Sequence, residues 1–288
     1  MLLIADSGST KTDWRLIDKE KSIHQLQTQG FNPFFQDSAD ISNILKQEFF
    51  EQLPPGFKFE DTRIFFYGAG CSSLQKCEIV ENGLKEVFQG ARIEVHHDLL
   101  AAARATCGKS PGIAAILGTG SNSCWYDGND IVQNIPALGF ILGDEGSGAH
   151  IGKTFIQDYL NKEVPESIRQ RFYERFKLSK EDILDAVYKK PFPNRFLAGF
   201  SKFVYQNLKE QYILNLVKTC FNQFFDKHIC KYEVHEQLKL NIVGSIGFYF
   251  SNIVRKIAQE RGIETDKIIE TPIAGLTLYH LDEFDRIE

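Results

Sequence analysis

Short apolar runs and amphipathic segments alternate along the first third of the chain. Residues 2–5 and 64–67 are continuous apolar runs, which are typical of strands buried on both faces of a sheet. Residues 41–50 and 74–88 carry apolar side chains at helical spacing, and residues 99–107 form an Ala-rich segment of the same kind. Strands that alternate with helices predict an α/β fold.

The opening pattern recurs after a segment rich in turn residues. Residues 113–117 form a second buried run that leads into Gly-Thr-Gly-Ser, as the first run leads into Asp-Ser-Gly-Ser. A strand-like segment with a tryptophan, Trp14 or Trp125, follows each of these turns. The repeat predicts a duplicated fold, with an N-terminal domain at residues 1–110 and a C-terminal domain with helical insertions at residues 111–272.

Charge and composition argue against several classes of protein. The 288 residues include 33 Lys and Arg against 38 Asp and Glu, a net charge of -5, without the basic stripe typical of a nucleic-acid binder. No apolar stretch approaches the roughly 18 residues of a membrane span, and the start of the chain does not resemble a signal peptide. We therefore expect a cytoplasmic protein with no membrane or nucleic-acid partner. Six cysteines without a Cys-x-x-Cys pair predict reduced thiols rather than disulfides or a zinc site.

Four glycine-containing loops, each predicted to follow a buried strand, are candidates for phosphate binding. They span residues 6–12, 118–122, 143–148 and 244–247. Glycine lets the backbone approach an anion and present its N–H groups. One loop of this kind is usually only a turn, but four in one chain predict a phosphate site. The Walker-like segment at residues 108–110 lacks the first glycine of that motif.

The order of these loops is similar to that in the actin, sugar kinase and heat-shock ATPase superfamily. Residues 6–12 resemble its first phosphate loop, residues 118–121 its second, and Gly244-Ser245 its adenosine-contacting loop. Residues 142–148, together with His97-Asp98-x-x-Ala-Ala, resemble the BadF/BadG/BcrA/BcrD ATPase family and, within it, the N-acetylglucosamine kinase branch. The resemblance implies two ribonuclease-H-like domains with ATP and Mg²⁺ in the cleft between them. It also implies that a C-terminal helix, at residues 273–288, returns to the first domain.

The same resemblance implies roles for individual residues. Phosphate or nucleotide contacts are expected from Ser7, Gly8, Ser9, Thr10, Lys11, Gly118, Thr119, Gly120, Ser121, Gly244 and Ser245. Sugar contacts are expected from Asn32, Asp98, Thr119, Gly143 and Asp144.

Four charged positions have two interpretations each. In the family, the residue that matches Asp98 is the general base that accepts the proton of a sugar hydroxyl as the γ-phosphoryl group moves; since Asp98 opens a helix, it could equally be an N-cap. Asp6 ends the first strand, and its carboxylate suits Mg²⁺, through water, although an ordinary turn also starts with such an aspartate. Lys11 is either a phosphate ligand or a solvated lysine. Glu145 either faces the metal or closes its turn.

The leading hypothesis is an ATP-dependent kinase that phosphorylates an amino sugar, N-acetylglucosamine, on its 6-hydroxyl. The partner is then a small-molecule sugar, and a homodimer is left open. The alternatives are a kinase of another hexose or of a muropeptide sugar, an ATPase that activates a 2-hydroxyacyl-CoA dehydratase, and an ATP-gated sensor or scaffold. Such activators hold an iron-sulfur cluster with paired cysteines, and no pair stands in the expected segment. Pro33-Phe34 and residues 136–140 depart from the tryptophan-containing segments of animal kinases, so the sugar is left open.

Overall fold

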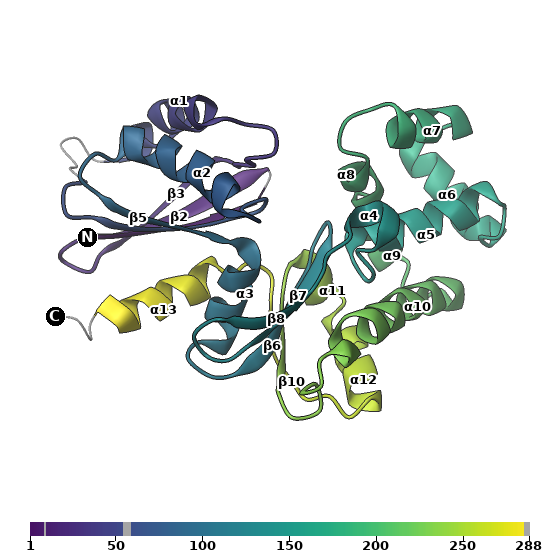
Figure 1. Cartoon of the computed structure of the whole chain (residues 1–288). Helices are drawn as coiled ribbons and strands as arrows, with labels where there is room; N and C mark the ends of the chain where they lie inside the picture. The colour runs from purple at the N-terminus through teal and green to yellow at the C-terminus, as the bar shows by residue number, and fades with distance from the viewer. Residues whose placement is uncertain (9, 54–58, 285–288) are drawn as a thin grey trace. The chain divides into compact units, whose positions relative to one another are not determined.

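The chain divides into two compact units, which we describe separately. The computed structural model describes residues 1–8, 10–53 and 59–284. Unit 1 comprises Met1–Gly108 and Pro272–Glu288, and unit 2 comprises Lys109–Thr271. Each unit holds one five-stranded mixed sheet with helices packed against it (Figure 1). The predicted α/β fold is confirmed.

The sheet of unit 1 brings the carboxyl ends of three strands to one edge. Its strands are β1 (Leu2–Ser7), β2 (Lys11–Ile17), β3 (Ile23–Gln29), β4 (Arg63–Gly68) and β5 (Arg92–His97). The order is β3-β2-β1-β4-β5, with β1, β4 and β5 mutually parallel and the β1, β2 and β3 neighbours antiparallel. Ser7 pairs with Gly68, and Gly68 pairs with His97. Asp6 and Asp98, each next to one of these paired residues, therefore lie at the same edge.

Helices cover both faces of this sheet (Figure 1). α1 (Ser38–Glu48) and α2 (Leu74–Val87) lie on one face, while α3 (Asp98–Cys107) and α13 (Ile273–Phe284) lie on the other. A short 3-10 helix, Phe50–Gln52, follows α1. The indole of Trp14 is fully buried among aromatic rings on the α1 and α2 side, and its N–H donates to the Thr28 hydroxyl (3.0 Å).

The last helix packs closely on α3, although some 170 residues separate the two in the sequence. A Cβ atom placed on Gly275 would lie 2.4 Å from the carbonyl oxygen and 2.9 Å from the Cβ of Ala105. His280, on the same helix, is buried and bonds through Nε2 to the Tyr67 hydroxyl (2.8 Å). α13 therefore completes the core of unit 1 only because a glycine stands at the closest approach.

The sheet of unit 2 repeats the topology of the first. Its strands are β6 (Gly112–Leu117), β7 (Ser121–Tyr126), β8 (Ile131–Ile135), β9 (Leu240–Val243) and β10 (Thr265–Ile269). The order is β10-β9-β6-β7-β8, in which β6, β9 and β10 are parallel and β7 and β8 extend an antiparallel meander. The predicted duplication is thus present at the level of strand order.

Most of unit 2 is helical. Its helices are α4 (Gly139–Leu142), α5 (Gly148–Leu160), α6 (Glu166–Phe176), α7 (Lys180–Tyr188), α8 (Pro193–Ala198), α9 (Ser201–Gln206), α10 (Gln211–Lys227), α11 (Ser245–Tyr249) and α12 (Ser251–Glu260), with a 3-10 turn at Ile229–Lys231. Phenylalanines of α5, α6, α9 and α10 join the apolar strands β6 and β9 in one core. A capping box starts α7, where Ser179 and Asp182 accept each other's backbone N–H groups (3.1 and 2.9 Å).

One structural prediction is wrong. The loop at residues 143–148 follows the short helix α4, not a buried strand. A short apolar run does not distinguish a strand from a helical turn, and Gly139, at φ +75°, starts the turn here. The side chains of Ile141 and Leu142 are 73% and 74% exposed, which a buried strand would not allow. No helix in the described part of the chain has the length and apolar character to span a membrane.

We predict that Gly275→Ala destabilises unit 1. Glycine to alanine in a helix normally stabilises by about 0.5–1 kcal/mol, but here the new methyl group overlaps Ala105, and overpacking costs about 1–3 kcal/mol. The thermal midpoint should fall by a few degrees in calorimetry. Leu278→Ala, on the exposed side of the same helix, is the control and should change it little. An increase for Gly275→Ala would contradict the close packing of α13 on α3.

Candidate functional site

The turn between β1 and β2 is held by backbone hydrogen bonds, one within the turn and one from the end of β3. The Gly8 N–H donates to the Lys11 carbonyl oxygen (3.0 Å), and the Gly30 N–H donates to the Thr10 carbonyl oxygen (3.1 Å). The Ser7 hydroxyl is buried, lies 2.8 Å from the Thr12 hydroxyl and accepts the Phe31 N–H (3.0 Å). The Ser7 side chain thus braces the turn, while Thr10 stays exposed. Ser9, also expected to contact phosphate, lies outside the described residues.

Three carboxylates and one ammonium gather at this end of the sheet. Asp6 pairs in register with Asp13 across the hairpin, and the Lys11 ammonium lies 2.9 Å from an Asp13 oxygen. Burial raises the pKa of Asp6 to about 7, with further upward contributions from Asp98 and Asp13 and an opposing one from Lys11. The negative charge of the Asp6 carboxylate is therefore only partly balanced by Lys11, and a divalent cation would balance it.

Asp98 is the first residue of α3, but it is not the cap of that helix. The cap is His97, whose Nδ1 accepts the Leu100 N–H (3.2 Å). Burial holds the pKa of His97 below its usual value, which keeps the ring neutral and able to accept. Burial also raises the pKa of Asp98 to about 6, against a hydrogen bond from the Leu99 backbone. The capping interpretation of Asp98 is wrong because the neighbouring histidine takes that role.

Asn32 lies in a turn that follows β3. Its Oδ1 accepts the Phe34 N–H (3.0 Å), and a Cβ atom on Gly70 would lie 2.7 Å from that oxygen. The side chain is half-buried and fixed by this turn. Unit 1 therefore holds Asp6, Lys11, Asn32 and Asp98 in or near the ends of its strands, at one edge of the sheet.

In unit 2 the corresponding turn connects β6 to β7. The Gly118 N–H donates to the Gly120 carbonyl oxygen (3.0 Å), and the carbonyl oxygens of Gly118 and Thr119 accept the first N–H groups of α5 (2.8 and 3.0 Å). A Cβ atom on Gly118 would meet nothing within 4 Å, so its backbone is open to a ligand. The Ser121 hydroxyl is buried and has no hydrogen-bond partner among the described residues, which suits a polar ligand.

Gly244 is placed where no other residue fits. It has φ +120°, and a Cβ atom there would lie 2.4 Å from the Leu117 carbonyl oxygen. Its N–H donates to the Ile269 carbonyl oxygen (2.9 Å), which ties the ends of β6, β9 and β10 together. Ser245 opens α11 and is exposed.

Asp144 lies against the β6–β7 turn. A Cβ atom on Gly120 would come within 2.9 Å of an Asp144 carboxylate oxygen. Asp144 is 7% exposed, and burial raises its pKa above the usual range, with Glu145 acting in the same direction. The structure thus brings Gly143 and Asp144 together with Gly118, Thr119 and Gly120 in one cluster of unit 2.

The Glu145 side chain contacts the end of α10. One carboxylate oxygen accepts a hydrogen bond from the Lys227 ammonium (2.8 Å), and the other lies 3.2 Å from His228 Nε2. Glu145 therefore attaches its loop to α10. Lys227 and His228 were missed by sequence reasoning, because nothing in the amphipathic pattern of residues 211–231 distinguishes its last residues.

The described part of the chain contains no group of three or more His, Cys, Asp or Glu side chains arranged to hold a metal ion. Mg²⁺ in kinases is usually held by one or two carboxylates together with substrate phosphates and water. Asp6 supplies one such carboxylate, so the residues present fit a magnesium ion that is bound together with a nucleotide.

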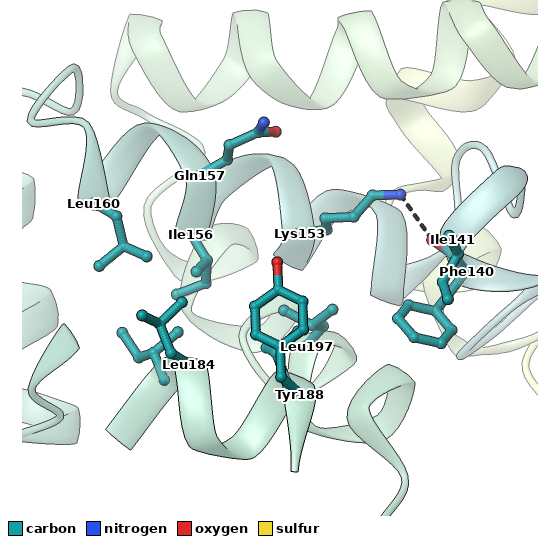
Figure 2. A pocket seen from close by; sticks show the side chains of 11 residues that line it. Phe140, Ile141, Lys153, Ile156, Gln157, Leu160, Leu184, Tyr188 and Leu197 are labelled. Atoms are coloured by element: carbon teal, nitrogen blue, oxygen red, sulfur yellow. Dashed lines mark hydrogen bonds between the residues drawn. The ribbon is translucent and has the colours of Figure 1, made fainter. Parts of the chain in front are cut away.

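A separate cavity of about 550 Å³ lies among α4, α5, α7 and α8 (Figure 2). Its lining is mainly apolar, with Ile156, Leu184 and Leu197 on the walls. Lys153 borders it and donates to the Phe140 carbonyl oxygen (2.7 Å). None of the residues predicted to contact nucleotide or sugar lines it.

The chain has relatives among solved structures that match it over nearly its whole length. No protein-family model and no curated protein matches the chain. The chain is 41% identical to a putative N-acetylglucosamine kinase of Porphyromonas gingivalis, with 97% of this chain and 98% of that chain covered and a TM-score of 0.91. A protein of the same description from Chromobacterium violaceum is 16% identical, with coverages of 96% and 98% and a TM-score of 0.77. MreB 5 of Spiroplasma citri, solved with AMPPNP, is 12% identical, with coverages of 99% and 97% and a TM-score of 0.62. The last two show likeness of fold alone.

We predict that Asp98→Asn stabilises the unliganded protein above pH 6. The pKa of Asp98 is about 6 in the folded chain and 3.8 in an exposed carboxyl, so the folded state binds this proton more tightly. The contribution of Asp98 to stability is therefore most favourable below pH 3.8 and is lost as the pH rises to about 6.

Asparagine removes that charge, so its advantage at pH 8 should be of the order of 1–3 kcal/mol and should vanish at low pH. Thermal melts of both proteins between pH 4.5 and pH 8 measure it. Equal stabilities at every pH would show that Asp98 is not buried in the unliganded protein.

Proposed function

The chain belongs to the BadF/BadG/BcrA/BcrD ATPase family of actin-like ATPases, and from this premise we propose that it is a sugar kinase that transfers the γ-phosphoryl group of ATP to the 6-hydroxyl of N-acetylglucosamine. The observation that carries the proposal is Asp98. It stands at the carboxyl edge of the first sheet, and its pKa of about 6 leaves it ionised at neutral pH yet basic enough to accept a proton. The 41% identity to the Porphyromonas gingivalis protein supports the same substrate class.

Asp98 acts as the general base in this proposal. The sugar hydroxyl gives its proton to the Asp98 carboxylate while its oxygen forms a bond to the γ-phosphorus. The bond from that phosphorus to the β,γ-bridging oxygen breaks, and ADP leaves. His97 caps α3 and so fixes the position of the first residue of that helix.

The backbone of the two glycine turns supplies the phosphate contacts. In unit 1 these would come from Thr10 and Lys11, with the Lys11 ammonium alongside, and in unit 2 from Thr119, Gly120, Ser121 and Ser245. Gly8, Gly118 and Gly244 would contribute by shaping the turns, since their own N–H groups donate within the protein. Such N–H groups stabilise anionic oxygens without added cations, which is compatible with the net charge of -5.

Asp6 would hold Mg²⁺, through water, and the ion would neutralise phosphate charge when it is bound. Asn32, Thr119, Gly143 and Asp144 would contact the sugar. A carboxylate can accept hydrogen bonds from two neighbouring hydroxyls, and an amide can both donate and accept. Asp144 and Asn32 thus suit a polyhydroxylated substrate.

We predict ATP-dependent phosphorylation of N-acetylglucosamine by the purified protein, with weaker or no turnover of glucose, mannose and N-acetylmannosamine. Asp98→Asn should lower kcat by about a hundredfold or more, the usual effect of losing a general base, and change ATP affinity by less than about threefold. ADP release and identification of the phosphosugar measure the first effect, and nucleotide titration measures the second. The proposal fails if ATP binds but no sugar raises ADP release above background.

We predict that Gly120→Ala weakens sugar binding. The new methyl group would stand 2.9 Å from the Asp144 carboxylate and displace it. The KM for sugar should rise about tenfold or more, as expected for a misplaced hydrogen-bonding group. Gly199→Ala, in the same unit at φ -58°, is the control. An unchanged sugar KM in Gly120→Ala would remove Asp144 from the sugar site.

A further inference from the structure

The backbone of Asp144 is in an unfavourable conformation. Its φ is +57°, in the left-handed region that residues with a Cβ atom avoid. Such a conformation persists only where the surroundings hold it. Its carbonyl oxygen accepts the Ser147 N–H (3.1 Å), which forms the turn but does not attach it to the rest of unit 2.

Two contacts, at Glu145 and Gly146, attach this turn to the end of α10. Glu145 is only 6% exposed, and it accepts the Lys227 ammonium at 2.8 Å while His228 Nε2 lies at 3.2 Å. One residue further on, Gly146 has φ +74°, and a Cβ atom there would lie 2.7 Å from the Cβ of Phe224. The turn is thus packed against one helix by a charged contact and an apolar one.

The ends of the turn are tied as well. Lys153, on α5, donates to the carbonyl oxygen of Phe140, on α4, at 2.7 Å (Figure 2). α4 leads into the turn and α5 leaves it, so this bond spans both of its ends. The first N–H group of α5, from Gly148, is bound in turn by the Gly118 carbonyl oxygen (2.8 Å).

The charged groups around the turn also change the pKa of Asp144. Glu145 raises the pKa of the adjacent Asp144, whereas His228 and Lys153 lower it. Burial alone would raise the pKa of Glu145, but hydrogen bonds from Lys227 and His228 bring it below its usual value. The Lys153 ammonium therefore favours the ionised form of Asp144, and the Lys227 ammonium favours the ionised form of Glu145.

We infer that Lys227 and His228 are positioning residues for the sugar site: they act through Glu145 to hold Asp144 in the orientation that receives sugar hydroxyls. The inference rests on the proposed function, since it assigns a purpose to the orientation of Asp144. Asp144 lies against Gly120, whereas Lys227 and His228 contact its neighbour Glu145, so they would act on Asp144 through Glu145.

The test compares Lys227→Met with Lys227→Arg. Methionine keeps the apolar stem and removes the donor, whereas arginine keeps a donor to Glu145. In Lys227→Met the KM for N-acetylglucosamine should rise about fivefold, the effect of one charge-assisted hydrogen bond, while the KM for ATP changes by less than about twofold. Lys227→Arg should recover most of the loss. Glu145→Gln, which keeps the shape of the side chain, should raise the sugar KM in the same way.

The control is Lys239→Met. Lys239 forms an ion pair of the same length, 2.8 Å, with Glu264 in the same unit, and both side chains of this pair are exposed. This variant should alter neither KM. If Lys227→Met raises both KM values together with a fall in thermal midpoint, or leaves both unchanged, the positioning role is overturned.

Hydrogen exchange separates this inference from the proposed function. The amides of residues 143–149 should exchange faster in Lys227→Met than in the wild type or in Lys239→Met. A wild-type protein that phosphorylates no sugar would contradict the proposed function, and hydrogen exchange alone would then test whether Lys227 fixes the turn that carries Asp144. Equal exchange at residues 143–149 in all three proteins would overturn the positioning role of Lys227.

Discussion

The first strand of each sheet lies between an antiparallel hairpin partner and a parallel neighbour, and this constraint governs the rest of both units. In unit 1 it places the end of β1 beside the ends of β4 and β5, so that Asp6 and Asp98 share an edge. In unit 2 it places the end of β6 beside those of β9 and β10, where Gly244 touches Leu117 and Ile269. Each strand end opens into a turn, because the chain must reverse into the hairpin. Most residues predicted for the site therefore gather where these strands end.

Local sequence signals were sufficient for these turns. The apolar runs of β1, β4 and β6 and the glycines that follow them carry their conformation within a few residues, and so the sequence predicts them. The sequence left Asp98 two roles, a general base or a helix N-cap, because aspartate is a preferred cap. The structure has His97 as the cap, since its Nδ1 reaches the Leu100 N–H while Asp98 already lies inside the helix.

The contacts across long sequence distances could not be predicted in this way. Glu145 and Lys227 are 82 residues apart, and only the packing of α10 against the loop brings them together. α4 is a local case: its apolar sequence suits a strand, but its first residue, Gly139, has φ +75°. Ser7 is predicted to contact phosphate, and its hydroxyl also braces the hairpin through Thr12 and Phe31, which the sequence did not predict.

The buried acids fall into two groups that differ in how their charge is balanced. Glu145 has hydrogen-bond donors in Lys227 and His228, and its pKa lies below the usual value. The pKa values of Asp6, Asp98 and Asp144 are raised, because burial outweighs the groups that lower them. A protein selected for stability alone would pair or remove such carboxylates, since an undercompensated buried charge destabilises the fold. Under the proposed function, ligands would supply the missing partners: a cation at Asp6, a proton at Asp98 and hydroxyl groups at Asp144.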